Sequence, residues 1–444
     1  MVRLPHPLVL MLGGIAIAAA LTWILPAGEF DRREDPATGR RVAVAGSYHP
    51  VEPRPVGPLA AIVAVPRGFV EGAEVIAVVL FVGGAWVLVD RLGTMTAVVG
   101  ALVGFFRTRG FLAIPLVSIF FATMGALENM EEEIIPLMPV LLLLGGGLGI
   151  DPVAVVAMSA GAAMIGAAFG PTNPFQAGIA LKLAQLSPLS GGLLRLTMFV
   201  LAVGAWIAFT MRYAARTRTP PVAPSQDGET RMDRRHAIAL AAMLTPMALY
   251  VYGALRLDWG LNELSGAFFV GAIVAGMVGG LGLAQSMTAY LDGMQALLPA
   301  AFMVGLARSI SLVLTDGRVV DSILNTFASG LAHLPAVTTA FLMVPVQALV
   351  HVAVPSVSGQ AVLTMPLMVP LADLLNFSRQ VPVLAYQMGA GLMELFTPTN
   401  GAIMAILLGA GVRYEHWLKF ASKAVIVPLL VGLAGIAAAV WLGI

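Results

Sequence analysis

Apolar residues in this chain come in long blocks separated by short polar breaks. Blocks of this kind are typical of helices in a lipid bilayer, where every backbone hydrogen bond must be satisfied within the segment. They cover residues 8–25, 70–90, 111–127, 134–149, 152–169, 175–185, 192–211, 237–255, 264–283, 295–314, 336–353, 361–377, 381–396, 401–411 and 420–443. Since about 20 apolar residues cross the hydrocarbon core, roughly nine to twelve crossings fit. The pattern predicts an all-α polytopic membrane protein in which several blocks are too short to cross alone.

The composition strengthens this prediction. Hydrophobic residues make up 59% of the 444 residues and charged residues 11%, against about 25% charged residues in soluble domains. The polar stretches 27–58 and 212–236 are too short to bury cores of their own and are predicted to be loops. No basic tract suits nucleic acid, and no cysteine is available for disulfides or thiolate metal sites. A soluble catalytic domain and a nucleic-acid-binding protein are therefore excluded.

The first apolar block, residues 8–25, has two interpretations. It could be a secretory signal peptide, because charged residues precede it. However, its 18 residues exceed the apolar core of a typical signal peptide. We expect a retained first helix.

Two short sequences occur twice in the same order. Residues 136–138, Pro-Leu-Met, recur as residues 366–368, and residues 171–173, Pro-Thr-Asn, recur as residues 398–400. The second sequence follows the first after 35 residues in one case and 32 in the other. One match means little in so biased a composition, but two collinear matches indicate an internal repeat.

The two repeats are predicted to be inverted in the membrane. If the hairpin in repeat 1 returns to the side from which it entered, five crossings separate equivalent segments, and an odd number inverts the second repeat. Inverted repeats with interrupted helices near the midplane are typical of secondary transporters. The predicted organisation begins with a first helix and external loop at 1–69. Repeat 1 follows at 70–212, with a re-entrant hairpin at about 111–149 and a broken helix at about 152–185, and then a cytoplasmic linker at 213–236 and two connecting helices at 237–292. Repeat 2 lies at 293–444, with a hairpin at about 336–377, a broken helix at about 381–411 and a last helix at 420–443.

Positive charges indicate the orientation. With a cytoplasmic N-terminus, 13 lysines and arginines lie inside and 11 outside, while Arg308 lies within a helix. Six of the outer eleven fall in residues 27–67, which also carry acidic residues, and without that loop the split is 13 to 5. The positive-inside rule then predicts a cytoplasmic N-terminus and an external C-terminus.

Each Pro-Thr-Asn sequence is predicted to interrupt a helix. Proline removes a backbone donor and clashes with the preceding turn, which leaves backbone carbonyls without partners. These carbonyls, with Thr172 and Asn173 or Thr399 and Asn400, are hard oxygen ligands suited to Na+, and the N-terminus of the following helix favours an anion. A structural proline kink explains either copy alone. The duplication favours a binding role.

A polar sequence separates the two arms of each predicted hairpin: residues 128–133 in the first and residues 355–360 in the second. A soluble loop at 128–133 would need both flanking arms to cross the bilayer, and they are only marginally long enough. Carboxylates at membrane depth are costly and mark ion or proton sites. We expect cation coupling, by Na+ or H+ and without another cofactor, at Glu128, Asn129, Glu131, Glu132, Asn173 and Asn400, with candidate Na+ sites at Asn129, Thr172 and Asn173 and at Ser356, Thr399 and Asn400.

Arg308 lies near the middle of an apolar helix. A charge there costs about 2.5 to 3.5 kcal/mol on insertion scales, so it needs a partner. Two hypotheses stay open: an ion pair with Glu394, or a bond to a substrate carboxylate. His351 is expected to be a hydrogen-bonded core histidine, with proton relay as the alternative. The predicted substrate-binding residues are Thr172, Asn173, Thr399, Asn400, Ser356, Ser358, Gln360, Arg308 and Glu394.

Two amphipathic stretches precede the hairpins. Residues 318–331 place apolar side chains on one helical face and Asp321, Asn325 and Ser329 on the other. Residues 94–106 occupy the equivalent place in repeat 1. Both are predicted to be interfacial arms, which suit a scaffold past which an inner unit slides.

At these motifs the chain resembles the YfcC-like and anaerobic C4-dicarboxylate carrier families of the ion transporter superfamily, which also includes the aminobenzoyl-glutamate transporters. The similar stretches are residues 24–30, 46–49, 305–314, 358–368 and 396–401. The resemblance implies two re-entrant hairpins, two unwound helices, a homodimer and elevator-type movement of a transport domain against a scaffold. More distant members carry Ser-Asn-Thr where this chain has Pro-Thr-Asn.

The sequence therefore predicts a secondary active transporter in the cytoplasmic (inner) membrane that moves a small carboxylate-bearing metabolite as a symporter or exchanger. The predicted site contains several acidic residues but only one basic residue, Arg308, which favours an amino acid over a C4-dicarboxylate or short-chain carboxylate. Helix N-termini, however, can hold carboxylates without a basic side chain. A cation/proton antiporter without organic substrate is the alternative. An intramembrane hydrolase would have to use His351 with Ser356 or Ser358.

Overall fold

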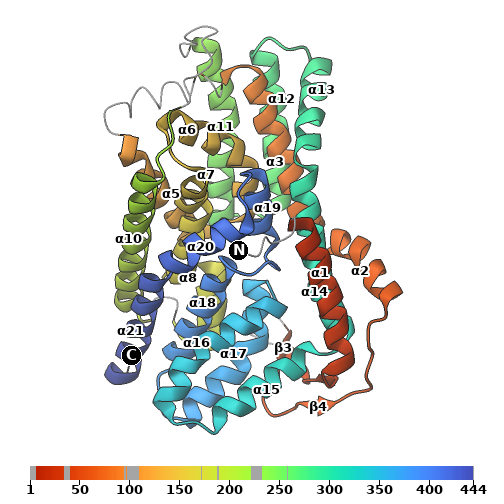
Figure 1. The fold of residues 1–444 in the computed structure, drawn as a ribbon, viewed down its shortest axis with the longest axis vertical. Coiled ribbons are helices and arrows are strands. Elements are labelled where there is room, and N and C mark those ends of the chain that lie inside the picture. The colour runs from red at the N-terminus through yellow and green to blue at the C-terminus, as the bar shows by residue number, and fades with distance from the viewer. Residues whose placement is uncertain are drawn as a thin grey trace.

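The computed structural model describes residues 7–34, 41–94, 97, 110–171, 173–187, 190–221, 233–257 and 259–443. Most of these residues are helical (Figure 1). Within them, 7 helices are long and apolar enough to cross a membrane. The chain is therefore a helical polytopic membrane protein, as the pattern of apolar blocks predicts.

The N-terminal region contains elements that the apolar pattern does not predict. Helix α1 (Pro7–Ile24) matches the first apolar block, but the expected loop forms two antiparallel pairs, β1 (Gly28–Glu29) with β4 (His49–Pro50) and β2 (Arg32–Glu34) with β3 (Arg41–Ala43). Helix α2 (Pro58–Glu71) then begins with a proline. Proline suits a first helical position because its missing N–H would have no partner there.

The segment predicted to be repeat 1 contains the following elements: α3 (Ala73–Arg91), η1 (Gly110–Leu112), α5 (Ala113–Glu128), η2 (Glu132–Leu137), α6 (Met138–Leu148), α7 (Pro152–Val156), η3 (Ala157–Gly161), α8 (Ala162–Phe169), η4 (Pro174–Gly178), α9 (Ile179–Leu183) and α10 (Gly192–Arg216). Helices α5 and α8 pack backbone against backbone. A Cβ on Gly166 would lie 2.0 Å from the Ala122 carbonyl oxygen, and one on Gly125 would lie 2.0 Å from that of Ala163. Small residues permit such close helix contacts in membranes.

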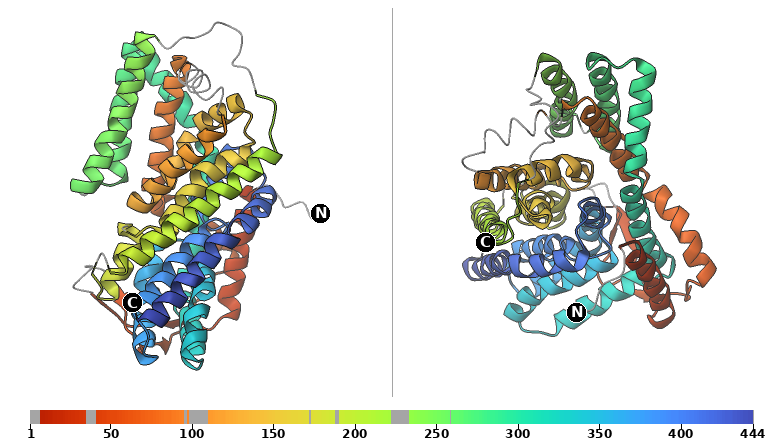
Figure 2. Two further views of the ribbon diagram at one scale, coloured as in Figure 1. Left: turned by 90° about the vertical axis from the view of Figure 1, so that its left-hand side faces the viewer. Right: turned by 45° about the horizontal axis from the view of Figure 1, so that its top comes forward.

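Three helices connect the repeats: α11 (Arg234–Arg256), α12 (Leu261–Val278) and α13 (Leu283–Ala296). Together with α3 they form a bundle with its own core, which includes Trp86, Phe268 and Tyr290. In Figures 1 and 2 this bundle stands at one end of the molecule, away from α15, α16 and α17. The sequence pattern missed α13 because polar residues such as Gln285 and Ser286 interrupt its apolar positions.

Repeat 2 contains α14 (Leu298–Asp316), α15 (Val320–Ala332), α16 (Ala336–Ala353), α17 (Val357–Leu374), α18 (Gln380–Glu394) and α19 (Gly401–Gly409). The chain ends with α20 (Tyr414–Ala424) and α21 (Ile426–Leu442), which are bent by 43° where one last helix is predicted. Helices α16 and α18 repeat the close packing of repeat 1, since a Cβ on Gly389 would lie 2.5 Å from the Val344 carbonyl oxygen.

The second predicted hairpin consists of α16 and α17, each of 18 residues. Both are long and apolar enough to cross a membrane. In the first hairpin, α5 has 16 residues and α6 has 11. Arm length therefore argues for re-entry in the first hairpin but not in the second.

Helix α15, predicted as an interfacial arm at residues 318–331, does not expose its polar face as expected. Asp321, expected on the polar face of residues 318–331, is 4% exposed. Its carboxylate accepts hydrogen bonds from the Arg32 guanidinium at 2.9 Å and from the Phe30 N–H at 3.0 Å. The β1 and β2 region thus covers this face of α15. Of the arm expected at 94–106, only residues 94 and 97 are described.

Both Pro-Thr-Asn sequences fall where helices end. Helix α8 ends at Phe169 and helical structure resumes at Pro174, while α18 ends at Glu394 and α19 begins at Gly401. We refer to residues 170–173 as break 1 and residues 395–400 as break 2. Thr172 lies outside the described residues.

Candidate functional site

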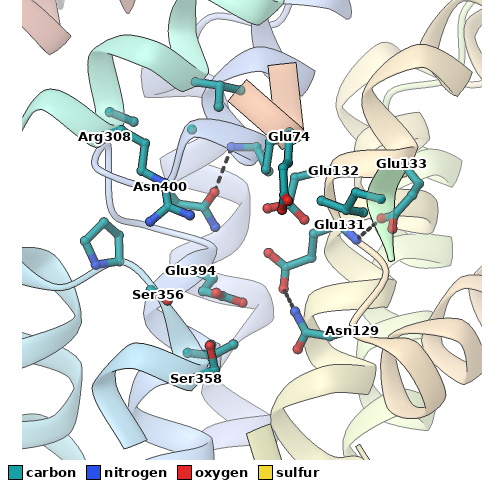
Figure 3. A pocket seen from close by; sticks show the side chains of 18 of the residues that line it. Glu74, Asn129, Glu131, Glu132, Glu133, Arg308, Ser356, Ser358, Glu394 and Asn400 are labelled. Atoms are coloured by element: carbon teal, nitrogen blue, oxygen red, sulfur yellow. Dashed lines mark hydrogen bonds between the residues drawn. The ribbon is translucent and has the colours of Figure 1, made fainter. Parts of the chain in front are cut away.

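A pocket of about 450 Å³ lies where segments from both repeats meet (Figure 3). Repeat 1 contributes the residues around the start of η2 and the first turn of α3. Repeat 2 contributes break 2, the start of α17 and the middle of α14. The polar lining residues are Glu74, Asn129, Glu131, Glu132, Glu133, Arg308, Ser356, Ser358, Glu394, Thr399 and Asn400. The pocket therefore brings together nine of the residues predicted from the sequence.

The turn after α5 aims a row of glutamates at the pocket. Asn129 adopts a left-handed conformation with φ of 57°, which asparagine tolerates better than most residues. Its amide Nδ2 lies 3.4 Å from Glu131 Oε1, and the Glu131 N–H donates to Glu133 Oε2 at 3.1 Å. These local bonds hold Glu131 towards the pocket, as Figure 3 shows.

Glu131 connects the first hairpin to repeat 2. Its carboxyl group interacts with that of Glu394 and with the amide of Asn400. Glu131 is 4% exposed and Glu394 is 3% exposed. Two acidic groups from different repeats are thus held against each other away from bulk water.

Two helix N-termini border the same pocket. Ser356 caps α17 by accepting the Gly359 N–H at 3.3 Å. Asn400 caps α19 by accepting the N–H groups of Ala402 and Ile403 at 2.8 and 3.3 Å. Helix N-termini attract negative charge, so this part of the pocket suits a carboxylate.

Arg308 and Glu394 do not form the ion pair that was one of the two hypotheses for Arg308. Their charged groups lie beyond ion-pair distance in the described structure. Arg308 is attracted electrostatically to Glu132 but forms no ion pair with it within the described residues. The nearest basic group to Glu394 is His351, whose Nε2 lies 3.6 Å from Glu394 Oε1. Arg308 lines the pocket, where it can face a bound carboxylate.

His351 is a buried, hydrogen-bonded histidine. Its Nδ1 lies 2.8 Å from Gln360 Oε1, and Gln360 Nε2 donates to the Gln347 carbonyl oxygen at 2.8 Å. Gln360 is thus a buried link between α17 and α16 and does not line the pocket, in contrast to its predicted role in substrate binding.

Asn173 lies apart from the pocket. It is 0% exposed, and its Nδ2 donates to the Gly125 carbonyl oxygen at 2.9 Å and to Asn129 Oδ1 at 3.0 Å. Its Oδ1 accepts the Gln176 N–H at 2.9 Å. Break 1 is thereby fixed to the first hairpin. Glu128 is the last residue of α5, and its side chain is not described.

The sequence predicts that carbonyls freed at the breaks are available to a cation, but three of them already accept hydrogen bonds from side chains. Gln387 Nε2 donates to the Gly170 carbonyl at 2.8 Å. At break 2 the Leu395 carbonyl accepts from Trp417 Nε1 at 2.7 Å, and the Phe396 carbonyl accepts from the Tyr414 hydroxyl. A Na+ ion at these carbonyls or at the asparagine oxygens would compete with existing bonds. Within the described residues no group of three His, Asp or Glu side chains is arranged to hold a metal ion.

Comparison with known proteins decides the family. Residues 4–441 match the model of the DcuC family, the C4-dicarboxylate anaerobic carriers. The chain belongs to this family.

Two curated relatives align over nearly their full length. The "Putative basic amino acid antiporter YfcC" of Escherichia coli is 29% identical over 466 aligned residues, which cover 94% of this chain and 92% of the relative. An uncharacterized protein of Haemophilus influenzae is 24% identical, and the alignment covers 96% of this chain and 95% of that protein.

Two solved transporter structures are also similar. The YdaH transporter of Alcanivorax borkumensis aligns with a TM-score of 0.42 at 17% identity, over 98% of this chain and 100% of that one. MtrF of Neisseria gonorrhoeae, from a class of antimetabolite efflux pumps, aligns with a TM-score of 0.44 at 17% identity, over 99% of this chain and 96% of that one.

Two polar residues of this member of the C4-dicarboxylate carrier family, Glu74 and Arg195, were not predicted from the sequence. Glu74 lies in the first turn of α3, where an acid is common at any helix start. Arg195, on α10, is 2% exposed, and its Nη2 donates to Gln387 Oε1 at 2.6 Å. The count of positive charges used for the orientation assigns Arg195 to the external side of the membrane, whereas the structure buries it beside break 1. Only its position amid apolar residues could have signalled this.

Proposed function

We propose that this chain is a secondary active transporter for an amino acid with a cationic side chain, driven by an ion gradient. The observation that carries the proposal is the charge of the pocket. Among the described lining residues, five glutamates stand against one arginine. Since charges buried in a membrane protein need partners, such a pocket favours a net cationic ligand over a dianion.

The pocket also accommodates the two ends of an amino acid differently. The α-carboxylate suits the N-termini of α17 and α19 together with Arg308, because both helix ends and the guanidinium favour negative charge. A cationic side chain suits the carboxyl groups of Glu131, Glu132 and Glu394, which line the same pocket. The curated relative named as a basic amino acid antiporter supports the same substrate class.

Alternating access is proposed to follow an elevator mechanism. The pocket lies between the bundle of α3, α11, α12 and α13, which has a separate core, and the unit built from the hairpins and broken helices. We propose that the bundle is the scaffold and that the broken helices are unwound transmembrane helices of the moving unit. Both hairpins are proposed to be re-entrant, the first because its arms are short and the second because it occupies the equivalent place in the predicted repeat. A homodimer in the cytoplasmic membrane, with the N-terminus inside, completes the proposal.

A C4-dicarboxylate is the second candidate substrate. The family is described by that substrate, and Arg308 with two helix N-termini offers binding groups for carboxylates. A hydrolase is not supported, because in the described residues no hydrogen bond joins His351 to Ser356 or Ser358. A cation/proton antiporter without organic substrate remains an outcome of the test.

Ligand-dependent thermal stability of the purified chain tests the proposal. Arginine and citrulline form a matched pair, since citrulline keeps the shape and loses the positive charge. Arginine at about 100 times its Kd should stabilise the protein by about 2.7 kcal/mol. Citrulline and succinate should stabilise it far less. Stabilisation by succinate but not arginine would favour a dicarboxylate carrier, and ion flux without any organic ligand would favour a cation/proton antiporter.

Variants locate the binding site. Glu131→Gln should weaken arginine binding by more than about tenfold, because a buried charge partner is worth about 2 to 5 kcal/mol. Glu415→Gln is the matched control, since Glu415 pairs with Arg413 away from the pocket. Equal arginine affinity in both variants would show that the ligand binds elsewhere.

A further inference from the structure

His351 and Glu394 form a buried pair at the edge of the pocket, which Glu394 lines. The His351 side chain is 0% exposed and the Glu394 side chain is 5% exposed, and the Nε2 to Oε1 distance is 3.6 Å. Among the described residues, neither His351 Nε2 nor Glu394 Oε2 has a hydrogen-bond partner. Buried polar atoms normally have hydrogen-bond partners, and these two have none.

The tautomer of His351 follows from its neighbours. Gln360 Nε2 lies 2.8 Å from the Gln347 carbonyl oxygen, which can only accept, so this end of the Gln360 amide is the NH2 group. The other end, Oε1, is an acceptor 2.8 Å from His351 Nδ1. Nδ1 must therefore carry the proton, and in the neutral ring Nε2 presents a lone pair to Glu394.

A lone pair and a carboxylate cannot face each other in a buried site without a proton. Glu394 also meets the Glu131 carboxyl group on its other side. Two carboxylates in contact favour the state in which one of them is protonated. Both neighbours of Glu394 thus favour a proton on its carboxyl group.

We infer that Glu394 binds a proton which it shares with His351 Nε2 and the Glu131 carboxylate, and that this proton is the ion exchanged for the substrate. The inference rests on the proposed function, because it takes the ligand to be cationic. The other charged groups that face this position are Glu132, Glu133 and Glu74 across the pocket, and Arg308, which interacts with Glu132.

The exchange is balanced in charge and in atoms. When a cationic substrate enters, the O–H bond of Glu394 breaks, the proton passes to pocket water, and the Glu394 carboxylate faces the cation. When the substrate leaves, a proton from water re-forms the O–H bond of Glu394 opposite His351 Nε2. One positive charge replaces another, so the site cannot hold both ions, and that exclusion produces antiport. His351 is a positioning residue that keeps the acidic proton on Glu394.

Proton release upon binding is the direct test. Arginine is added to the full-length protein in detergent, in weakly buffered solution with a pH indicator. About one proton should be released for each arginine bound, as expected when one shared proton is displaced. Glu394→Gln should release none, while Glu415→Gln should release as many as the wild type. His351→Gln should shift the pH dependence of release, which a purely structural role would not do.

Infrared difference spectroscopy gives a readout that needs no substrate. The ligand-free protein should show the carbonyl stretch of a buried carboxylic acid, absent in Glu394→Gln and shifted in His351→Gln. Arginine binding without proton release at any pH would overturn the inference and leave the proposed function standing. If arginine does not bind at all, the proposed function is wrong. The infrared band then decides on the proton site, and its absence from the wild type would overturn that as well.

Discussion

The two breaks carry the same Pro-Thr-Asn sequence but differ in what surrounds them. At break 1, Asn173 is fully buried and bonds to the first hairpin. At break 2, Thr399 and Asn400 line the pocket. The same three residues thus stand at an interrupted helix in both places, while the neighbouring helices bury one break against the first hairpin and leave the other at the wall of the pocket.

The partners of the freed carbonyls show the same division. Break 1 is satisfied by Gln387, which belongs to the other repeat, and by Arg195 on α10. Break 2 is satisfied by Tyr414 and Trp417 of α20, a helix within the same predicted repeat. The loss of a partner at break 1 should thus loosen the contact between the repeats, and a loss at break 2 should act locally.

The largest effect on stability is expected for Gln387→Leu. This change removes the buried amide that bonds both the Gly170 carbonyl and the charged Arg195 Nη2, and it leaves these two groups only their 3.4 Å contact with each other, which should cost about 2 to 4 kcal/mol. Thermal unfolding of the purified protein measures the loss.

Gln380→Leu is the matched control for that variant. Gln380 lies on the same helix and is 2% exposed, but neither atom of its amide has a partner among the described residues. Leucine there should leave the unfolding temperature unchanged or raise it, because an unsatisfied buried amide is removed. Equal losses in the two variants would show that burial, and not the bond to break 1, sets the stability.

A crossed effect is expected for the two asparagines. Asn173→Ala removes three buried hydrogen bonds and should cost about 2 kcal/mol of stability with little change in arginine affinity. Asn400→Ala removes a helix cap worth about 1 kcal/mol of stability, and it should weaken arginine binding more than Asn173→Ala does. Melting curves with and without arginine separate the two effects. Identical behaviour of the variants would contradict the division between the breaks.

The smallest effect is expected for Trp417→Phe. The variant keeps the stacking on Phe420 and removes the donor to the Leu395 carbonyl, at a cost of about 1 kcal/mol. If that carbonyl were a Na+ ligand, its release would increase stabilisation by Na+ over K+. We expect no such increase, and thermal unfolding in the two salts provides the comparison.

Much of the site was predictable because its signals are local. The Pro-Thr-Asn sequences indicate helix breaks through proline sterics, and the glutamates at 131 and 132 stand out in an apolar chain. These features need no knowledge of the neighbouring helices. Pocket residues such as Ser356 and Asn400 were therefore named from the sequence alone.

The errors concern contacts between distant segments. The hypothesis of an ion pair between Arg308 and Glu394 failed, because Glu394 lies against His351 and Glu131 instead. The bond between Arg195 and Gln387 joins residues 192 positions apart. Nothing in the local pattern encodes such a pairing. The helices α2 and α13 were missed for another reason, since they do not form the long apolar blocks on which the prediction relied.

The bare glycine faces between α5 and α8 limit how the molecule can move. With carbonyl oxygens occupying the space where Cβ atoms would stand at Gly125 and Gly166, neither helix can turn or shift along the other without a collision. The two helices must therefore move as one rigid body, and any conformational change during transport has to occur at other, less tightly packed helix contacts.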